Sequence, residues 1–179
     1  MEEAREKILA VKTESDCHWH MIGHVQSRKS NQVVEFFDYV HSLDSMKLAL
    51  RLNTHASTLN KVLPVFLEFN LSGEESKSGW QSWNEDEWRA LLLEIDAIMQ
   101  LSNLRVCGLM TMPPYFDNPE DARPYFRKLN NLRGYFMRQL KIADLLELSM
   151  GMSGDYEVAI EEGATWVRIG QAILGPRRP

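Results

Sequence analysis

The chain has 179 residues, and 20 Lys and Arg against 25 Asp and Glu leave a formal charge of −5. This acidic balance argues against a nucleic-acid partner, because binding to phosphates needs a dense basic surface. With 44% hydrophobic and 25% charged residues, the composition is typical of a globular protein and excludes a mainly disordered, collagen-like or coiled-coil chain. The length suits one domain over residues 1–179.

The cysteines and the apolar runs indicate a cellular compartment. There are only two cysteines, Cys17 and Cys107, and no charged-then-apolar leader is visible, so we expect reduced thiols and a cytoplasmic location. Cys107 lies between Val106 and Gly108 without a neighbouring cation, which predicts a buried, inert thiol. No apolar run approaches the roughly 18 residues that span a bilayer, so no membrane partner is expected.

Short apolar runs alternate along the chain with longer segments of helical spacing. A helix is expected over residues 2–12, followed by strands at 19–22, 39–43 and 62–70. A helix at 84–102 has an acidic first turn and apolar residues every three or four positions. Next come a strand at 106–112 and a helix at 118–140, whose C-terminal half Gly134 weakens. A strand at 146–150, a helix at 156–162 and a strand at 165–169 complete the series.

This alternation predicts an α/β fold with parallel strands joined by helices. A dinucleotide-binding sheet is disfavoured, because the first strand is followed by a single glycine, Gly23, instead of a glycine-rich turn. Polar or glycine-containing clusters follow nearly every strand, as in a (β/α)8 barrel whose active face is built from its βα loops. About six of the eight βα units can be recognised, so we expect a barrel of this type that is incomplete.

The loops after the last two strands are candidates for an anion site. The first contains Ser153 and Asp155, which could present a hydroxyl and backbone N–H groups to an anion or simply cap the next helix. The second follows Arg168, which is costly to bury without a partner, and contains Gly170, which permits close backbone approach. Because this barrel architecture usually binds phosphate after its last two strands, we predict a phosphate site here.

Two further segments allow a functional and a structural interpretation. His18, His20 and His24 could suggest a metal site, but the alternating apolar residues favour a strand and a zinc spacing is lacking, so no metal is expected. A hydrogen-bonded core histidine is the expected outcome for at least one of them. The polar loop at 70–79 has the length of a substrate-contacting loop, although a solvated surface turn fits equally well.

Six motifs occur in the order found in one known family. They are Trp-His-Met-Ile-Gly-His-Val-Gln-Ser at 19–27, His-Ser-Leu-Asp at 41–44, Asn-Leu-Ser-Gly-Glu-Glu-Ser-Lys-Ser-Gly at 70–79, Gly-Leu-Met-Thr-Met at 108–112, Leu-Ser-Met-Gly-Met-Ser at 148–153 and Val-Arg-Ile-Gly at 167–170. Over nearly the whole chain the sequence resembles the pyridoxal 5′-phosphate homeostasis proteins, also described as the YggS or PROSC family. Such proteins are similar to the N-terminal barrel domain of alanine racemase and are regarded as non-catalytic carriers or regulators of the cofactor.

The resemblance implies roles for particular residues. Ser153, with the backbone of Gly170 and Gln171, would hold the phosphate of pyridoxal 5′-phosphate, and Arg168 would face its pyridine nitrogen. His24 and Met150 would lie near the ring. A guanidinium at the ring nitrogen disfavours protonation of that nitrogen, so the ring becomes a poorer electron sink. We therefore expect cofactor binding without catalysis.

The sequence departs from the family pattern at its start. Family members carry a Schiff-base lysine in a motif like Ala-Val-Ser-Lys on their first strand, upstream of the Trp-His motif. Lys12 lies too close to Trp19 for that role, so we expect Lys12 to be solvated, the barrel to be N-terminally truncated, and cofactor binding to be weak or non-covalent. The alternatives are a racemase-like enzyme that uses pyridoxal phosphate and a fragment that does not bind it. Open barrel edges would favour self-association.

Overall fold

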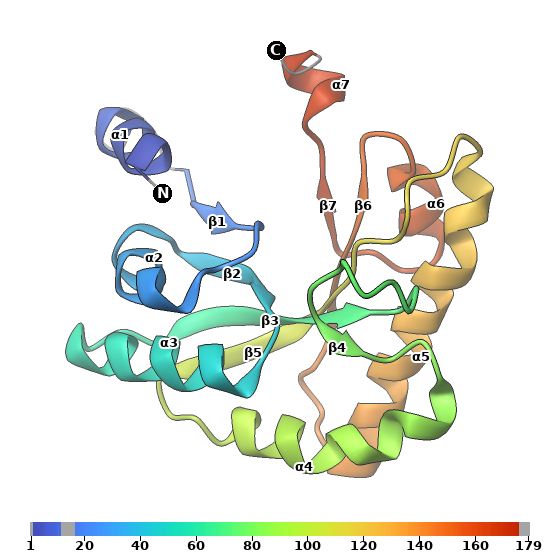
Figure 1. Cartoon of the computed structure of the whole chain (residues 1–179), viewed down its shortest axis with the longest axis horizontal. Helices are drawn as coiled ribbons and strands as arrows, with labels where there is room; N and C mark the ends of the chain where they lie inside the picture. Colours follow the sequence, from blue (N-terminus) through green and yellow to red (C-terminus); the bar gives the residue numbers. More distant parts are fainter. Residues whose placement is uncertain (1, 12–16, 176–179) are drawn as a thin grey trace.

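Six parallel strands form one curved sheet in the computed structural model, which describes residues 2–11 and 17–175 (Figure 1). Their order in the sheet is β1, β2, β3, β5, β6, β7, so each strand lies beside its neighbour along the chain. The strands are β1 (His20–Met21), β2 (Tyr39–Leu43), β3 (Leu63–Asn70), β5 (Leu104–Met110), β6 (Glu147–Met152) and β7 (Trp166–Arg168). A short strand, β4 (Trp80–Gln81), pairs with the end of β3. The expected half-barrel of six strands is confirmed, and Lys12 lies outside the described residues.

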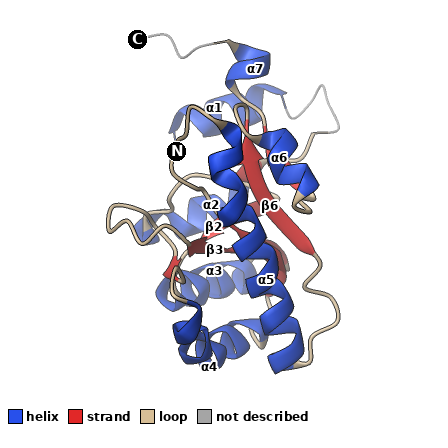
Figure 2. Ribbon diagram, turned by 90° about the vertical axis from the view of Figure 1, so that its right-hand side faces the viewer, coloured by secondary structure: helices blue, strands red, loops and turns tan. Residues whose placement is uncertain are grey.

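The helices that connect the strands lie on the outer side of this sheet (Figures 1 and 2). They are α2 (Ser30–Phe36), α3 (Met46–Thr58), α4 (Trp88–Met99), α5 (Arg123–Leu140) and α6 (Tyr156–Glu161). Helix α1 (Glu2–Val11) precedes β1, and α7 (Gln171–Leu174) follows β7 and lies beyond the end of that strand (Figure 1). Short 3-10 turns, Ser27–Lys29, Glu85–Glu87 and Pro119–Ala122, precede α2, α4 and α5. Because all six strands of the sheet are parallel, their carboxyl ends meet at one rim, and the loops after the strands lie together there.

Local sequence explains where the long helices begin. The side chains of Asn84 and Asn118 each accept a hydrogen bond from a backbone N–H two residues later, which caps the 3-10 turns ahead of α4 and α5. Helix α5 continues without interruption through Gly134, so the predicted weakening there was wrong. Its buried residues, Phe126, Leu129, Leu132 and Phe136, form one stripe against the sheet. Packing of that stripe outweighs the cost of one glycine.

Three helices and one strand were missed by the sequence interpretation. Helix α3 could have been recognised, because Ser45 accepts a hydrogen bond from the Leu48 N–H as an N-cap and Leu48, Leu52 and Ala56 are buried at helical spacing. Helices α2 and α7 and strand β4 are short, with seven, four and two residues. Each contains fewer than two full periods of its pattern. In the described part of the chain, no helix combines the length and apolarity required to cross a bilayer.

The two faces of the sheet are packed differently. Residues that point outward, such as Leu67, Leu109 and Leu148, join the main core beneath the helices. A smaller cluster lies on the concave face and contains the buried side chains of Phe66, Cys107 and Met110, with Tyr39 and Trp166 packed against it. Successive residues of a strand point to opposite faces, which separates these two sets. Cys107 is buried as predicted, and burial raises the pKa of its thiol.

Gly108 permits the close approach of β5 and β6. A Cβ atom at this position would lie 1.9 Å from the carbonyl oxygen of Glu147. Substitution Gly108→Ala should therefore push the two strands apart and lower the free energy of unfolding by about 3 kcal/mol, measured by chemical denaturation. Gly154→Ala is the matched control, since nothing lies within 4 Å of the added atom. Equal stabilities of the two variants would contradict this role of Gly108.

Both edge strands of the sheet could pair with a second chain. Among the described strands, β1 pairs only with β2 and β7 only with β6, so both present unpaired backbone groups. We predict that sedimentation velocity of the purified chain shows a mass that rises with concentration. A species that stays monomeric and unfolds in one sharp thermal transition would contradict that prediction.

Candidate functional site

A small cup forms where the loops after β6 and β7 meet. The Ser153 hydroxyl oxygen accepts hydrogen bonds from the backbone N–H groups of Gly170, at 3.1 Å, and Ala172, at 3.4 Å. Asp155 holds the other side of the loop by accepting from the Met152 N–H at 2.6 Å. In this structure Ser153 thus occupies the acceptor position at the start of α7. An anion that enters the cup would find the same N–H groups together with the hydroxyl.

Arg168 reaches from β7 along the concave face to the ends of β5 and β6. Its Nη1 atom donates to the carbonyl oxygen of Ser149, at 3.0 Å, and to the Ser149 hydroxyl, at 2.9 Å. Its Nη2 atom donates to the carbonyl oxygen of Thr111 at 3.0 Å. Burial lowers the pKa of Arg168 to about 10, against the opposing effects of Asp155 and Glu68. The guanidinium is therefore still a cation at neutral pH and is anchored mainly by neutral acceptors.

A chain of side-chain hydrogen bonds extends from Arg168 to the edge strand β1. Ser149 Oγ lies 2.8 Å from His41 Nδ1, and His41 Nε2 lies 2.9 Å from His20 Nδ1. Ser149 Oγ accepts from Arg168 and can donate its own proton to His41 Nδ1. In that tautomer His41 Nε2–H donates to His20 Nδ1. Burial lowers the pKa of His41 to about 3, with His20 and Arg168 adding to the effect, so His41 is neutral in the folded chain.

Aromatic rings support these histidines on the concave face. His20 stacks on Tyr39 with ring centroids 4.4 Å apart, and His41 stacks on Phe66 at 4.2 Å. Trp166 contacts both histidine rings. Burial lowers the pKa of His20 as well. His20 is half-buried on the edge strand β1 and its hydrogen bond goes to the His41 side chain, so it lies in a strand as expected but is not a core histidine bonded to the backbone. No group of three potential metal ligands occurs within residues 2–11 and 17–175.

His24 lies at the rim, between the end of β2 and the loop after β3. Its Nδ1 atom is 3.0 Å from Asp44 Oδ2 and 3.3 Å from Ser78 Oγ. Both contacts use the same ring nitrogen, so these three residues do not form a serine-histidine-aspartate relay, which requires one partner on each nitrogen. The Nε2 atom of His24 makes neither of these contacts.

The loop at 70–79 is folded back toward this rim by Asn70. The Asn70 side chain accepts hydrogen bonds from the N–H groups of Ser72 and Gly73 and donates to the carbonyl oxygen of Glu74 at 2.8 Å. This arrangement brings Ser78 to His24. The loop thus lies beside the candidate site, which supports the interpretation as a ligand-contacting loop over that of a solvated turn.

Glu68 is the site residue that the sequence interpretation missed. The residue is 3% exposed, and its Oε2 atom makes no hydrogen bond to any part of the chain that the structure describes. Burial, with a smaller contribution from Asp44, raises the pKa of Glu68 to about 7, and Arg168 opposes the shift. A signal was present, since Glu68 is the single charged residue in the apolar run from Leu63 to Phe69, at a position two residues from the inward-facing Phe66.

The remaining predicted site residues lie in different surroundings. Gln171 is exposed at the first position of α7, next to the cup. Met150 is fully buried in the main core, on the opposite face of β6 from Ser149. The structure therefore brings Ser153, Gly170 and Gln171 together and leaves the Met150 side chain away from them. A position of Met150 beside a bound ring stays a prediction.

The neutral state of His41 makes stability depend on pH. In the unfolded chain His41 takes up a proton near its ordinary pKa of 6.5, whereas the folded chain resists protonation until about pH 3. The unfolded state therefore binds more protons between these values, and stability falls as the pH falls. Relative to a His41→Asn variant, the native chain should lose about 2 kcal/mol of unfolding free energy between pH 6.5 and 4.

The measurement is chemical denaturation of both chains across this pH range. Ser57→Ala, at an exposed residue of helix α3 that does not titrate, is the control and should change stability by the same amount at every pH. A difference between native and His41→Asn chains that does not vary with pH would contradict a neutral, buried His41.

Comparison with known proteins identifies relatives of the chain. Residues 2–178 match the family model described as "Alanine racemase, N-terminal domain". The chain is 45% identical over 178 residues to the pyridoxal phosphate homeostasis protein of Aquifex aeolicus, covering 99% of this chain and 75% of that protein. Its structure superposes on PipY of Synechococcus elongatus, solved with PLP bound, with a TM-score of 0.84 and 32% identity over 97% of this chain and 78% of that one.

A more distant match concerns the fold alone. Alanine racemase of Clostridium difficile superposes with a TM-score of 0.69 at 14% identity, over 98% of this chain and 44% of the racemase. The sequence identities to the homeostasis protein and to PipY, the parallel half-barrel and the six ordered motifs all indicate the same family. The chain therefore belongs to the alanine racemase N-terminal domain family, among the pyridoxal phosphate homeostasis proteins.

Proposed function

We propose that this protein binds pyridoxal 5′-phosphate at the rim of the half-barrel and serves in cofactor homeostasis without catalysing a reaction of its own. The single observation that carries the proposal is the half-buried cation Arg168 beside a cup of backbone N–H groups. The names of the relatives and the bound PLP in PipY support the same ligand.

The residues present suit the two polar ends of this cofactor. Ser153 and the N–H groups of Gly170, Gln171 and Ala172 offer hydrogen-bond donors to a phosphate. Arg168 donates to Ser149 and Thr111, and the further N–H groups of its guanidinium are available to donate a hydrogen bond to a pyridine nitrogen. His24 and Met150 would lie near the ring.

The same residues explain why binding need not lead to catalysis. Bound pyridoxal phosphate supplies an electron-withdrawing ring that is most effective when its nitrogen is protonated. Arg168 is a cation that only donates hydrogen bonds, so it favours the unprotonated nitrogen. Racemisation would also require proton-transferring groups on both faces of a substrate. In the part of the rim that the structure describes, His24, whose Nδ1 lies beside Asp44 and Ser78, is a candidate for one such group.

Loss of the Ser153 hydroxyl should weaken the cup. Ser153→Ala removes one hydrogen bond to a charged phosphate, and we expect the affinity for pyridoxal phosphate to fall about tenfold. The measurement is the absorption spectrum of the protein titrated with the cofactor and again after desalting. Ser57→Ala, on the exposed side of α3, is the matched control and should bind like the native chain.

The same experiment separates the alternatives. Borohydride treatment followed by peptide mass analysis would reveal any lysine that holds the cofactor covalently. Racemisation of alanine by the loaded protein would point to an enzyme and against a homeostasis role. A native chain that retains and binds no pyridoxal phosphate would refute the proposed function.

A further inference from the structure

Glu68 lies on the concave face of the sheet, close to the proposed binding site. It follows Phe66 of the inner cluster by two residues, whereas Leu67 and Phe69 belong to the main core, so its side chain points inward. The charged groups that act on it are Asp44, directly after β2, and Arg168, from β7. Arg168 directs its hydrogen bonds to Ser149 and Thr111, and Glu68 Oε2 has no partner among the described residues.

A buried carboxyl oxygen without a hydrogen-bond partner destabilises the folded state, because its desolvation is not compensated by a hydrogen bond. Such an atom in a native structure therefore needs an explanation, and a ligand that donates to it is one. Asp44 adds a second acidic group on the same side of the rim, where it also contacts His24. The rim is thus acidic where β2 and β3 end and rich in N–H donors where β6 and β7 end.

A ligand that matches this polarity carries a phosphate at one end and a cation at the other. A metal ion is disfavoured, since no group of three potential ligands occurs in the described part of the chain. A primary ammonium fits, because its three N–H donors can satisfy one or two carboxylate oxygens. Ammonium groups on small molecules are charged at neutral pH, as a lysine side chain is.

We infer that the site prefers a phosphorylated pyridine that bears a primary ammonium, as in pyridoxamine 5′-phosphate, over one that bears a hydroxyl, and that Glu68 determines this preference as the acceptor of the ammonium. The inference rests on the proposed function, since it concerns the same site. Glu68 selects between ligands that share the phosphate and the ring and differ in one substituent.

Protonation of Glu68 accompanies this selection. Burial and Asp44 raise the pKa of Glu68 to about 7, so the carboxyl group is partly protonated at neutral pH. An ammonium beside it stabilises the carboxylate and lowers its pKa. Binding of the amine therefore releases a proton from Glu68 to the buffer, whereas binding of an uncharged analogue does not.

The experiment compares pyridoxamine 5′-phosphate with pyridoxine 5′-phosphate, which carries a hydroxyl in place of the amine. Isothermal titration of the native chain at pH 7 should give an affinity at least about tenfold higher for the amine. In Glu68→Gln, which keeps the shape and removes the charge, the two affinities should become equal. Glu157→Gln, on the exposed side of α6, is the control and should keep the native preference.

A second measurement uses the native chain alone and does not depend on how the variant folds. Titration in two buffers of different ionisation enthalpy should reveal release of roughly half a proton per pyridoxamine phosphate bound at pH 7, and none with pyridoxine phosphate. Equal affinities for both esters in the native chain would overturn the inference while leaving the proposed function intact. Failure of both esters and of pyridoxal phosphate to bind would instead overturn the proposed function.

Discussion

The guanidinium of Arg168 is a cation placed among apolar and aromatic side chains on the inner face of a half-barrel. It is held there by the carbonyl oxygens of Ser149 and Thr111, which lie at the ends of neighbouring parallel strands. Neutral acceptors satisfy its N–H groups without cancelling its charge. The positive charge thus stays available at the rim. The other polar side chains of the concave face are either linked to Arg168 by hydrogen bonds or act on the same site through their own charge.

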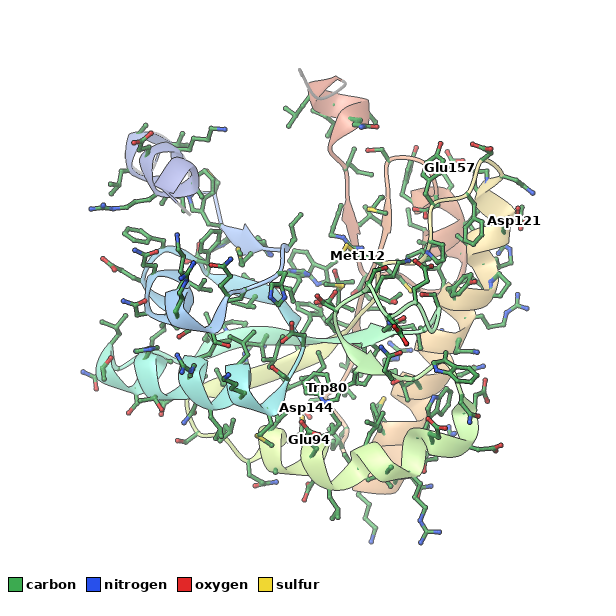
Figure 3. All side chains as sticks on the ribbon, in the orientation of Figure 1. Trp80, Glu94, Met112, Asp121, Asp144 and Glu157 are labelled. Atoms are coloured by element: carbon green, nitrogen blue, oxygen red, sulfur yellow. The ribbon has the colours of Figure 1, made fainter. Side chains whose placement is uncertain are left out.

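The polar groups around Arg168 form two sets with opposite character. The Ser149 hydroxyl links Arg168 by hydrogen bonds to His41 and, through His41, to His20. Burial among aromatic rings lowers the pKa of both histidines and keeps them neutral. Toward the other side, Glu68 and Asp44 make the rim acidic. Met112, labelled in Figure 3, is an exposed residue shortly after the end of β5. Its carbonyl oxygen accepts a hydrogen bond from Lys77 of the loop that precedes β4, at 3.3 Å, so this loop is joined to the rim.

Much of the architecture could be predicted from local pattern. The β-branched runs around Val40, Val65 and Val106 were recognised as strands because buried parallel strands are apolar on both faces. The helix over 118–140 followed from its cap and its stripe of apolar residues. Helix α2 and strand β4 could not be found this way, because their seven and two residues contain less than two periods. Gly134 was misjudged, since helix propensity is a weak term beside tertiary packing.

The sequence by itself determined the alternation of strands and helices, the half-barrel that follows from it, and the identity of the chemically distinctive residues at the strand ends. These depend on periodicity and on residue type, which are local properties. Only the tertiary structure decided which of those residues meet. Ser153 meets Gly170, and Arg168 meets Ser149 and Thr111, through hydrogen bonds between different strands and loops. Met150 is buried in the main core and Glu68 on the concave face. Each position depends on which face of its strand is turned inward, and the curvature of the assembled sheet determines which face that is.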